Sequence, residues 1–279
     1  MLVSAHGRAC DPVAEVLAHP QVFFLTGGGD TPATLCAKLT AAGLGAAHAL
    51  VGENLGSPAE AIRFGLAREL AEQTFAPLSV LLIEREALPS RRTPGLPDDA
   101  FIRGAVPMTK QEVRAAALAK LAVTPTDTLW DVGAGTGSVS VELALAAPAG
   151  QVYAVECDPE ACALIQQNRE KFAAYNLTLI EGKAPDALDA LPAPDAVFIG
   201  GTKGNMDAVI DAVLHKNPVA RLCITAIALE TLSAAVAALT AHGLSAEVTQ
   251  IAVSRTKTAG SLHLLMANNP VFLITGART

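Results

Sequence analysis

The sequence has few aromatic residues and no apolar stretch long enough to cross a membrane. Aromatic residues make up 4% of the 279 residues, whereas hydrophobic residues make up 51%. That apolar content excludes a disordered chain, because enough surface can be buried to offset the entropy of ordering. The first residues, MLVSAHGRACDP, lack the basic and apolar regions of a signal peptide. We therefore expect a cytoplasmic protein without a membrane partner, in which helices pack on sheets.

Positive charge is also scarce. Lys and Arg number 20 against 27 Asp and Glu, which gives a formal net charge of −7, and no basic run is present. A broad nucleic-acid-binding surface is therefore disfavoured, although a local basic pocket is not. Five cysteines without a C-x-x-C pair and six scattered histidines indicate reduced thiols and no metal site.

A break in the sequence divides the chain into two parts. The segment REALPSRRTPGLPDD, residues 85–99, contains three prolines and a glycine and interrupts every periodicity. We expect a linker at 89–100 between a domain at 1–88 and a larger one at 101–279. In the first domain the pattern predicts strands at 21–26, 46–52 and 78–84, with helices at 32–43 and 57–70 between them. This alternation is typical of a small parallel α/β sheet.

The larger part alternates strands and helices for much longer. A helix at 109–123 is expected to begin with a capping box formed by Thr109 and Glu112. Five strand–helix units follow, with strands at 128–133, 151–156, 177–182, 195–200 and 220–227. Three further strands, at 245–254, 261–267 and 270–276, have no helix between them. The sequence therefore predicts a doubly wound α/β sheet of Rossmann-like type with antiparallel strands at one edge.

The segment DVGAGTG, Asp131–Gly137, lies between the first strand and the first helix of that sheet. Ligands of such sheets bind at the carboxyl ends of the strands, where glycines let the backbone approach them. The spacing G-x-G-x-G differs from the G-x-G-x-x-G of dinucleotide-binding loops. It resembles the loop of Rossmann-like methyltransferases that bind S-adenosyl-L-methionine. Glu156 ends the next strand about twenty residues later, where an acidic side chain can accept hydrogen bonds from both ribose hydroxyls.

Two further strand ends complete the expected donor site. EGKAP, at 181–185, follows the strand where related enzymes hold the adenine with backbone groups. FIGG, at 198–201, follows the strand where donor and acceptor usually meet, whereas NNPVF, at 268–272, is interpreted as a turn. The predicted donor-binding residues are Thr109, Asp131, Gly133, Ala134, Gly135, Thr136, Gly137, Glu156, Gly182, Ala184 and Gly200.

Several separate blocks carry a closer resemblance. They are PDDAFIRGAVPMTKQEVRAAALAKL, LWDVGAGTGSVSVELAL, EGKAPDAL, PDAVFIGG and NNPVFLITG. From about Pro97 onward the chain resembles the C15-methylating, decarboxylating part of the precorrin-6Y C5,15-methyltransferases of cobalamin biosynthesis. The resemblance implies S-adenosyl-L-methionine as donor, a precorrin tetrapyrrole as acceptor and loss of CO2 from an acetate side chain. It also implies a donor contact from the PMTK segment at Thr109, and assembly as a tetramer.

The first part of the chain resembles the second half of the tetrapyrrole methylase fold, which carries C5 methylation in this family. SAHGR, VGENLGSPAEAIR and LLIE carry that resemblance. The first half of that fold, with its Gly- and Pro-rich donor loop, has no counterpart in the sequence. TGGGD, at 26–30, is interpreted as a turn before a helix. We therefore do not expect this chain alone to methylate C5.

An acceptor with many carboxylates requires cations in its pocket despite the acidic total charge. The candidate substrate-binding residues are Arg103, Lys110, Arg114, Arg255 and Lys257. The last two lie in SRTKTAGS, which is expected to be a polar loop between edge strands. No side chain is identifiable as an acid, base or nucleophile. Methylation of an electron-rich ring carbon does not require a strong base.

Three alternatives share the glycine loop. An RNA base methyltransferase on the same fold is one, because fold does not fix function, but the acidic balance argues against it. A non-catalytic module that only binds the donor is another, and the sequence does not separate it from an enzyme. An NAD-dependent enzyme is the third, and the glycine spacing disfavours it.

Overall fold

The computed structural model describes residues 1–8, 10–85 and 94–278, and the chain divides into two compact units, Met1–Ser90 and Arg91–Thr279. We describe each unit by itself. The linker expected at 89–100 falls into two pieces. Residues 89–93 lie outside the described residues, whereas residues 94–100 pack on the second unit. The backbone N–H groups of Gly95 and Leu96 donate to the buried carboxylate of Glu142, which fixes this piece in place.

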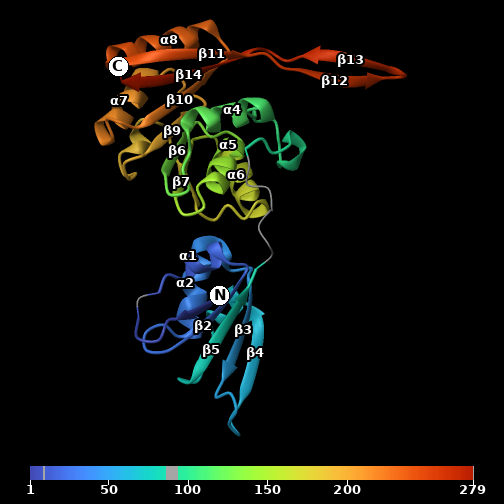
Figure 1. Ribbon diagram of the computed structural model, residues 1–279, viewed down its shortest axis with the longest axis vertical. Coiled ribbons are helices and arrows are strands. Elements are labelled where there is room, and N and C mark those ends of the chain that lie inside the picture. The colour runs from blue at the N-terminus through green and yellow to red at the C-terminus, as the bar shows by residue number, and fades with distance from the viewer. Residues whose placement is uncertain (9, 86–93, 279) are drawn as a thin grey trace. The chain divides into compact units, whose positions relative to one another are not determined.

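The first unit is a five-stranded mixed sheet with helices on one face (Figure 1). The strands lie in the order β1-β2-β5-β3-β4, and only β1 and β2 are parallel. In chain order the elements are β1 (Leu2–Ser4), α1 (Pro12–Ala18), β2 (Gln21–Leu25), α2 (Pro32–Leu39), a π-helical turn (Thr40–Leu44), β3 (His48–Glu53), β4 (Ala61–Leu66), α3 (Ala67–Leu70) and β5 (Ser79–Glu84).

Two expectations for this unit are wrong. The three predicted strands exist as β2, β3 and β5, but β5 pairs antiparallel with both β2 and β3. The helix expected at 57–70 is mostly strand β4, followed by the single turn α3. Ser57 does accept a hydrogen bond from the N–H of Ala59, as an N-cap would, but the chain turns there and continues as strand β4 instead of a helix. Ile62, Phe64 and Leu66 alternate with Arg63 and Gly65, a period of two that suits pairing with β3.

The local signals around α2 are confirmed. Thr31 caps the helix, since its hydroxyl accepts from the N–H of Thr34, and Pro32 is the first helical residue. Gly43 has a φ of 88°, a left-handed conformation that ends the helical segment. The TGGGD segment is a turn before the helix, with Gly27 and Asp30 exchanging backbone hydrogen bonds.

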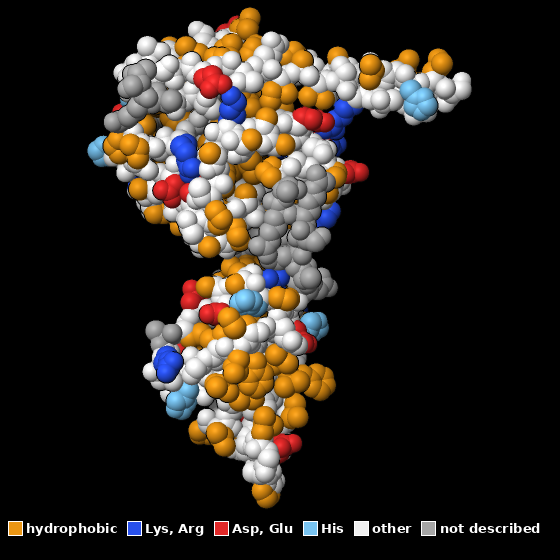
Figure 2. All heavy atoms as spheres, in the orientation of Figure 1, with side chains coloured by type: hydrophobic (Ala, Val, Ile, Leu, Met, Phe, Trp, Pro, Cys, Tyr) orange, Lys and Arg blue, Asp and Glu red, His pale blue; other side chains and the backbone are white. Residues whose placement is uncertain are grey.

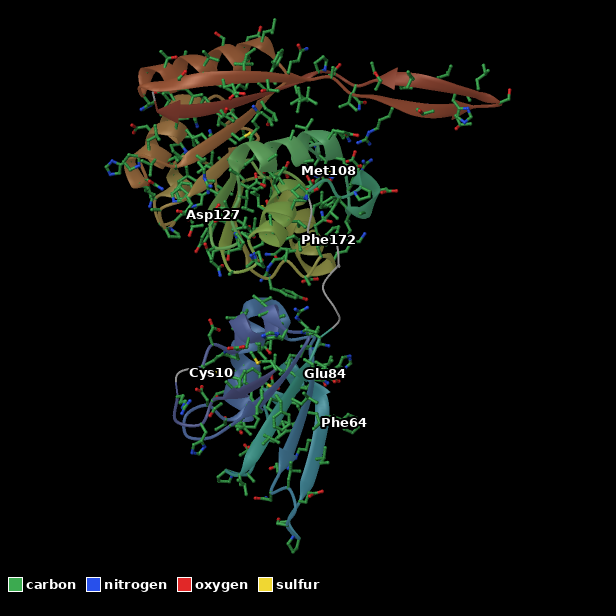
Figure 3. All side chains as sticks on the ribbon, in the orientation of Figure 1. Cys10, Phe64, Glu84, Met108, Asp127 and Phe172 are labelled. Carbon is green, nitrogen blue, oxygen red and sulfur yellow. The ribbon has the colours of Figure 1, made fainter. Side chains whose placement is uncertain are left out.

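One face of this sheet carries apolar side chains that the helices do not cover (Figure 2). The register places Leu2, Phe23, Leu82, Leu50 and Phe64 in one row across all five strands. Phe64 projects from β4 and is 83% exposed (Figure 3).

The second unit is a seven-stranded sheet in the order β11-β14-β10-β9-β6-β7-β8 (Figure 1). The strands from β10 to β8 are parallel, and β14 runs antiparallel between β10 and β11. The predicted Rossmann-like α/β fold with antiparallel edge strands is therefore confirmed. The elements are a 3-10 turn (Asp98–Ala100), α4 (Gln111–Leu121), β6 (Thr128–Val132), α5 (Ser138–Ala146), β7 (Gln151–Glu156), α6 (Pro159–Lys171), β8 (Leu177–Glu181), a 3-10 turn (Asp186–Leu188), β9 (Ala196–Ile199), α7 (Met206–Lys216), β10 (Arg221–Ala226), α8 (Leu229–Ala241), β11 (Leu244–Ile251), β12 (Ser254–Ala259), β13 (Leu262–Ala267) and β14 (Val271–Arg278).

Helices cover both faces of this sheet and bury two apolar clusters. Helices α4, α5 and α6 pack on one face and α7 and α8 on the other. Successive residues of each parallel strand alternate between the clusters, as Leu129 and Trp130 do in β6. Burial on both faces explains why these strands read as nearly continuous apolar runs. None of the described helices has the length and apolar character needed to cross a bilayer.

The SRTKTAGS segment is not a loop. It forms β12, which pairs with β13 in a two-stranded sheet that projects from the rest of the unit, and we call this hairpin the arm (Figure 1). The segment at 261–267 is thus half of the arm rather than an edge strand of the main sheet. Gly260, with a φ of 63°, supplies the left-handed residue of the two-residue turn between Ala259 and Leu262.

The capping box expected for α4 is also wrong. The helix begins at Gln111, and Lys110 is its N-cap without a side-chain hydrogen bond. The carboxylate of Asp98 accepts from the N–H of Gln111 at 2.9 Å and so caps the helix from outside its own sequence. Glu112 is paired with Arg255 instead.

Candidate functional site

A cavity of about 850 Å³ opens at the carboxyl ends of β6, β7, β8, β9 and β10. This is the edge of a parallel sheet at which ligands bind, and the volume suits a small-molecule site. The opposite wall is built from residues 106–110 and from Val113 of α4. Asn268 and Asn269, at the return from the arm, line it as well. Strand ends distant in sequence therefore converge on one hollow.

The glycines of the loop after β6 are required mainly by contacts within the protein. Gly133, Gly135 and Gly137 have φ values of 73°, 55° and 74°. A Cβ on Gly133 would lie 2.4 Å from the carbonyl oxygen of Gly201, and one on Gly137 would lie 3.0 Å from Ile165 Cγ1. The sequence suggested that the missing side chains make room for a ligand. The space is occupied instead by neighbouring segments, although Gly133 and Gly135 do line the cavity.

Glu156, at the end of β7, is the carboxylate that this loop organises. Its Oε2 accepts from Gly135 N at 2.9 Å, and its Oε1 accepts from Cys157 N at 2.7 Å and Asp158 N at 3.0 Å. An ionised carboxylate has about four acceptor positions, so these three bonds leave one free. Glu156 lines the cavity and is 8% exposed. The side chain is therefore held in one orientation with acceptor capacity for a ligand hydroxyl.

Asp131 lies beneath the loop and not among the described residues that line the cavity. Its side chain accepts a hydrogen bond from the hydroxyl of Ser140, and among the described residues Oδ1 has no partner. Burial, followed by the nearby charge of Glu156, raises the pKa of Asp131 to about 7. The loop thus rests on a carboxyl group that titrates near neutral pH, well above the usual range of an aspartate.

The remaining predicted donor residues divide between the cavity and the core. Thr109, Ala134, Gly182, Ala184 and Gly200 line the cavity. The buried residue Thr136 and Gly137 do not, and the hydroxyl of Thr136 has no hydrogen-bond partner among the described residues.

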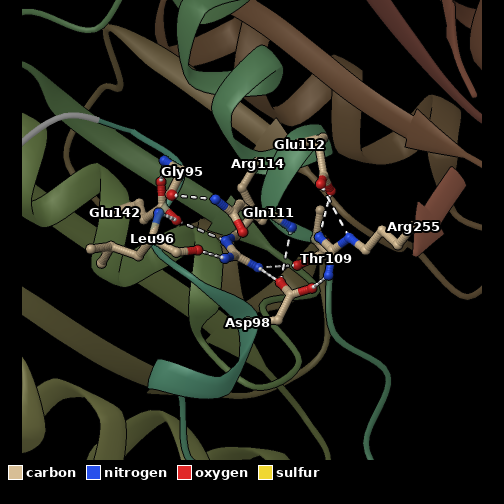
Figure 4. A network of polar contacts seen from close by, with 9 residues as sticks. All are labelled: Gly95, Leu96, Asp98, Thr109, Gln111, Glu112, Arg114, Glu142 and Arg255. Carbon is tan, nitrogen blue, oxygen red and sulfur yellow. Dashed lines mark hydrogen bonds and ion pairs between the residues drawn. The ribbon is translucent and has the colours of Figure 1, made fainter. Parts of the chain in front are cut away.

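The predicted acceptor cations do not gather in the cavity. Lys110 lines it, but the described lining does not include Arg103, Arg114, Arg255 or Lys257. Arg114 is fully buried. Its guanidinium lies 2.8 Å from both Asp98 Oδ1 and Glu142 Oε1 (Figure 4). Both carboxylates are themselves buried. Arg114 is therefore a structural residue, and the expectation that it binds substrate is wrong.

Arg255 connects the arm to the segment before α4 (Figure 4). Its guanidinium lies 2.6 Å from Glu112 Oε2 and 2.9 Å from Asp98 Oδ2. Burial alone would raise the pKa of Asp98, but the hydrogen bonds and charges of Arg114 and Arg255 outweigh it and lower that pKa. Because its charge is used by two carboxylates, Arg255 is not free to bind an acidic substrate.

Sequence reasoning missed several residues of the cavity. Lys183 follows β8, while Thr202 and Lys203 follow β9, and all three line the cavity. Lys203 Nζ lies 3.2 Å from the Sγ of Cys157, which also lines it. Each residue lies in the loop after a strand whose end had been recognised, β8 or β9, so its place in the fold was the signal that could have found it. Asn268 and Asn269 had been interpreted only as part of a turn.

Comparison with known proteins agrees with this geometry. Residues 99–277 match the family model of the precorrin methyltransferase domain. Over 186 residues the chain is 46% identical to a probable cobalt-precorrin-6B C(15)-methyltransferase (decarboxylating) of Pyrobaculum calidifontis, covering 66% of this chain and 95% of the relative. Over 219 residues it is 39% identical to a precorrin-6Y C(5,15)-methyltransferase [decarboxylating] of Sinorhizobium sp, covering 77% of this chain and 52% of that protein.

Solved structures give the same result. The crystal structure of precorrin-6Y C5,15-methyltransferase from Geobacter metallireducens GS-15 superposes with a TM-score of 0.64 at 40% identity. The match covers 67% of this chain and 97% of that chain. The resemblance stated from about Pro97 onward and the fold expected for the second unit are thereby confirmed. The chain belongs to the precorrin methyltransferase family.

Proposed function

We propose that the second unit transfers a methyl group from S-adenosyl-L-methionine to C15 of a precorrin and promotes loss of CO2 from an acetate side chain, as a step of cobalamin biosynthesis. The family match, together with a cavity whose glycine loop fixes Glu156, carries this proposal. When bound, the donor would supply the methyl group of its sulfonium for in-line transfer to the ring carbon, with S-adenosylhomocysteine as the leaving group.

The residues of the cavity fit such a donor. The free acceptor position of Glu156 suits a ribose hydroxyl, since backbone donors already hold the carboxylate in place. Gly182 and Ala184 follow the end of the neighbouring strand β8 and line the cavity, where their backbone groups would be available to an adenine. A Cβ on Gly201 would meet no protein atom within 4 Å, so open space lies beside the loop after β9. Thr109 closes the opposite wall.

The contribution of the protein to methyl transfer is mainly positioning. Alignment of two bound reactants supplies up to ~7–11 kcal/mol of the barrier reduction. An electron-rich ring carbon is nucleophilic without a strong base, and the methylated ring can accept the electrons released by decarboxylation. The proposed role of the cavity walls is therefore to orient the acceptor and to exclude water.

We propose further that the first unit corresponds to the second half of a tetrapyrrole methylase fold and does not methylate C5 by itself. We assign the first domain to residues 1–88 and extend the second, expected at 101–279, back to Pro94, because residues 94–100 pack on the second unit. We also infer a homo-oligomer, with the tetramer as the size that the resemblance implies. The arm supports it, because an isolated two-stranded hairpin with exposed Leu264, Leu265 and Met266 is marginally stable in water. We place the enzyme in the cytoplasm, with no nucleic-acid or membrane partner.

The decisive experiment measures two products at once. The purified chain is incubated with labelled donor and a precorrin-6B acceptor, and S-adenosylhomocysteine and CO2 are quantified. We expect both products in equal amounts, and no methylation of tRNA. Methylated tRNA would favour the RNA enzyme, and donor binding without any turnover would favour a binding module. A C5-methylated product would overturn the assignment of the first unit.

A further inference from the structure

The cations of the second unit differ in what surrounds them. Arg114, Lys120, Arg221 and Arg255 are ion-paired with carboxylates of the protein. In the part of the chain that the structure describes, Lys110, Lys183 and Lys203 make no such pair, and all three are exposed and line the cavity. Among the described residues, no carboxylate therefore neutralises the lysines of the cavity, and their charges are available to an anionic ligand.

The carboxylates that line the same cavity are already engaged. Glu156 accepts three backbone hydrogen bonds, and Asp158 caps α6 by accepting from the N–H of Glu160. Neither forms an ion pair with a lysine among the described residues. A protein with a net charge of −7 thus presents unpaired ammonium groups at this opening. Such a local excess of positive charge attracts and orients an anionic ligand.

Lys203 has the most restricted position of the three. It has a φ of 49°, and no other non-glycine residue in the described chain that has a positive φ lines the cavity. Left-handed non-glycine residues are uncommon and cluster at binding sites. Its ammonium lies 3.2 Å from the thiol of Cys157, directly after Glu156. The side chain is therefore directed across the loops that follow β7 and β9.

We propose that Lys183 and Lys203, together with Lys110, bind the peripheral carboxylates of a tetrapyrrole acceptor and orient its ring in the cavity. This inference rests on the proposed function for the identity of the acceptor. The lysines take the substrate-binding role that the sequence had suggested for Arg114 and Arg255, because the charges of these two arginines are neutralised by carboxylates of the protein. Three cations from separate loops can contact a ring with carboxylates around its edge and so fix its rotation.

The test uses a stable tetrapyrrole rather than turnover. Uroporphyrin I carries a carboxylate on every side chain, and its octamethyl ester is a matched ligand without charge. Binding of both to the full chain is followed by fluorescence at low and high salt. We expect the octacarboxylate to bind in a salt-dependent way and the ester to bind much more weakly. Absence of octacarboxylate binding, or equal binding of the ester, overturns the inference.

Variants identify the lysines. Lys183→Met and Lys203→Met keep the apolar stem and remove the charge, and each should lower octacarboxylate affinity about three- to tenfold. Lys203→Arg should retain most of it. Lys171→Met is the control, because Lys171 is exposed and forms no ion pair in the described chain but lies outside the cavity lining. Losses no greater than that of the control, or an equal loss of S-adenosylhomocysteine affinity by calorimetry, contradict the assignment.

Alkylation of Cys157 gives a second readout. Cys157 is the exposed member of the five free cysteines. Bound octacarboxylate should slow its reaction with N-ethylmaleimide, as measured by peptide mass spectrometry, and Lys203→Met should reduce that protection. Unchanged alkylation at saturating octacarboxylate would place the ligand elsewhere. Because these assays need no methyl transfer, they can detect tetrapyrrole binding even if the chain has no methyltransferase activity. They can also fail while the activity is present, so the two failures are distinguishable.

Discussion

Asp98 accepts from two arginines that reach it from opposite directions. Its Oδ1 lies 2.8 Å from Arg114 of α4, and its Oδ2 lies 2.9 Å from Arg255 of the arm. The same carboxylate caps α4 through Gln111 N. Asp98 therefore joins three parts of the second unit: the segment before α4, α4 itself and the base of the arm (Figure 4).

We predict that the two arginines differ in their contribution to stability. Arg114→Met should lower the free energy of unfolding by about 3–5 kcal/mol, because it leaves the buried carboxylate of Glu142 without a counter-charge and leaves Asp98 with Arg255 as its remaining one. Arg255 is 39% exposed, so Arg255→Met should cost about 1 kcal/mol or less. Urea unfolding can be followed by the fluorescence of the single tryptophan, Trp130, in β6.

Acid sensitivity provides a check on the same network. The folded pKa of Asp98 is lowered below its usual value of 3.8, so its stabilisation is present above that value and is lost as pH falls through the folded pKa. Without Arg255 the folded pKa should rise, and the acid-induced loss should begin at higher pH. Lys257→Met, elsewhere in the arm, should leave the acid limb unchanged. An identical acid limb in Arg255→Met would mean that Arg114 alone sets this pKa.

The sequence was sufficient for most of the second unit because its signals are local. Parallel strands buried on both faces read as apolar runs, and Thr128–Val132 could be located without knowledge of its neighbours. Strand β4 could not be located in this way, because Ser57 and Pro58 have the pattern of a helix start. The alternation from Ile62 to Leu66 is short, and the strand conformation there depends on pairing with β3. Tertiary pairing overrides a weak local pattern.

The candidate site divides in the same way. Glu156 and the glycine loop could be found from spacing along the chain, as they lie 21 residues apart at Gly135. The partners of the two arginines could not be found in this way. Arg114 pairs with Glu142, which is 28 residues away in the sequence, and Arg255 pairs with Asp98, which is 157 residues away. A cation that binds ligand and one that is neutralised inside the protein look alike until those contacts are known.

Asp131 should make the second unit less stable as pH rises. Its folded pKa, about 7, is above its usual value of 3.8, so the folded state binds the extra proton between these values. The stabilisation is complete below 3.8 and is lost as pH rises toward 7. Asp131→Asn should flatten this dependence and, because Asp131 does not line the cavity, keep S-adenosylhomocysteine affinity within about twofold. Loss of donor binding in a folded variant would restore Asp131 as a donor contact.

Glu156→Gln should weaken donor binding by about 1–3 kcal/mol, which corresponds to about 5- to 150-fold, because a charged acceptor for the ribose is lost. Calorimetry with S-adenosylhomocysteine measures it. Glu181→Gln is the matched control, since Glu181 pairs in register with Glu156 on the adjacent strand but is exposed and outside the cavity lining. Equal affinities for the two variants would mean that another group holds the ribose.

Two neighbouring glycines that both line the cavity, Gly133 and Gly201, should respond oppositely to the same added methyl group. In Gly133→Ala the new Cβ would lie 2.4 Å from the backbone oxygen of Gly201 at a φ of 73°, so the loop must shift and the unit should lose stability. In Gly201→Ala the Cβ meets no protein atom within 4 Å, so the thermal midpoint should stay within about 2 °C of the parent. The methyl group nevertheless enters the cavity, and binding of S-adenosylhomocysteine or of the acceptor should fall. If Gly201→Ala binds both ligands as the parent does, the space beside β9 lies outside the site, and the donor and acceptor must meet closer to Glu156.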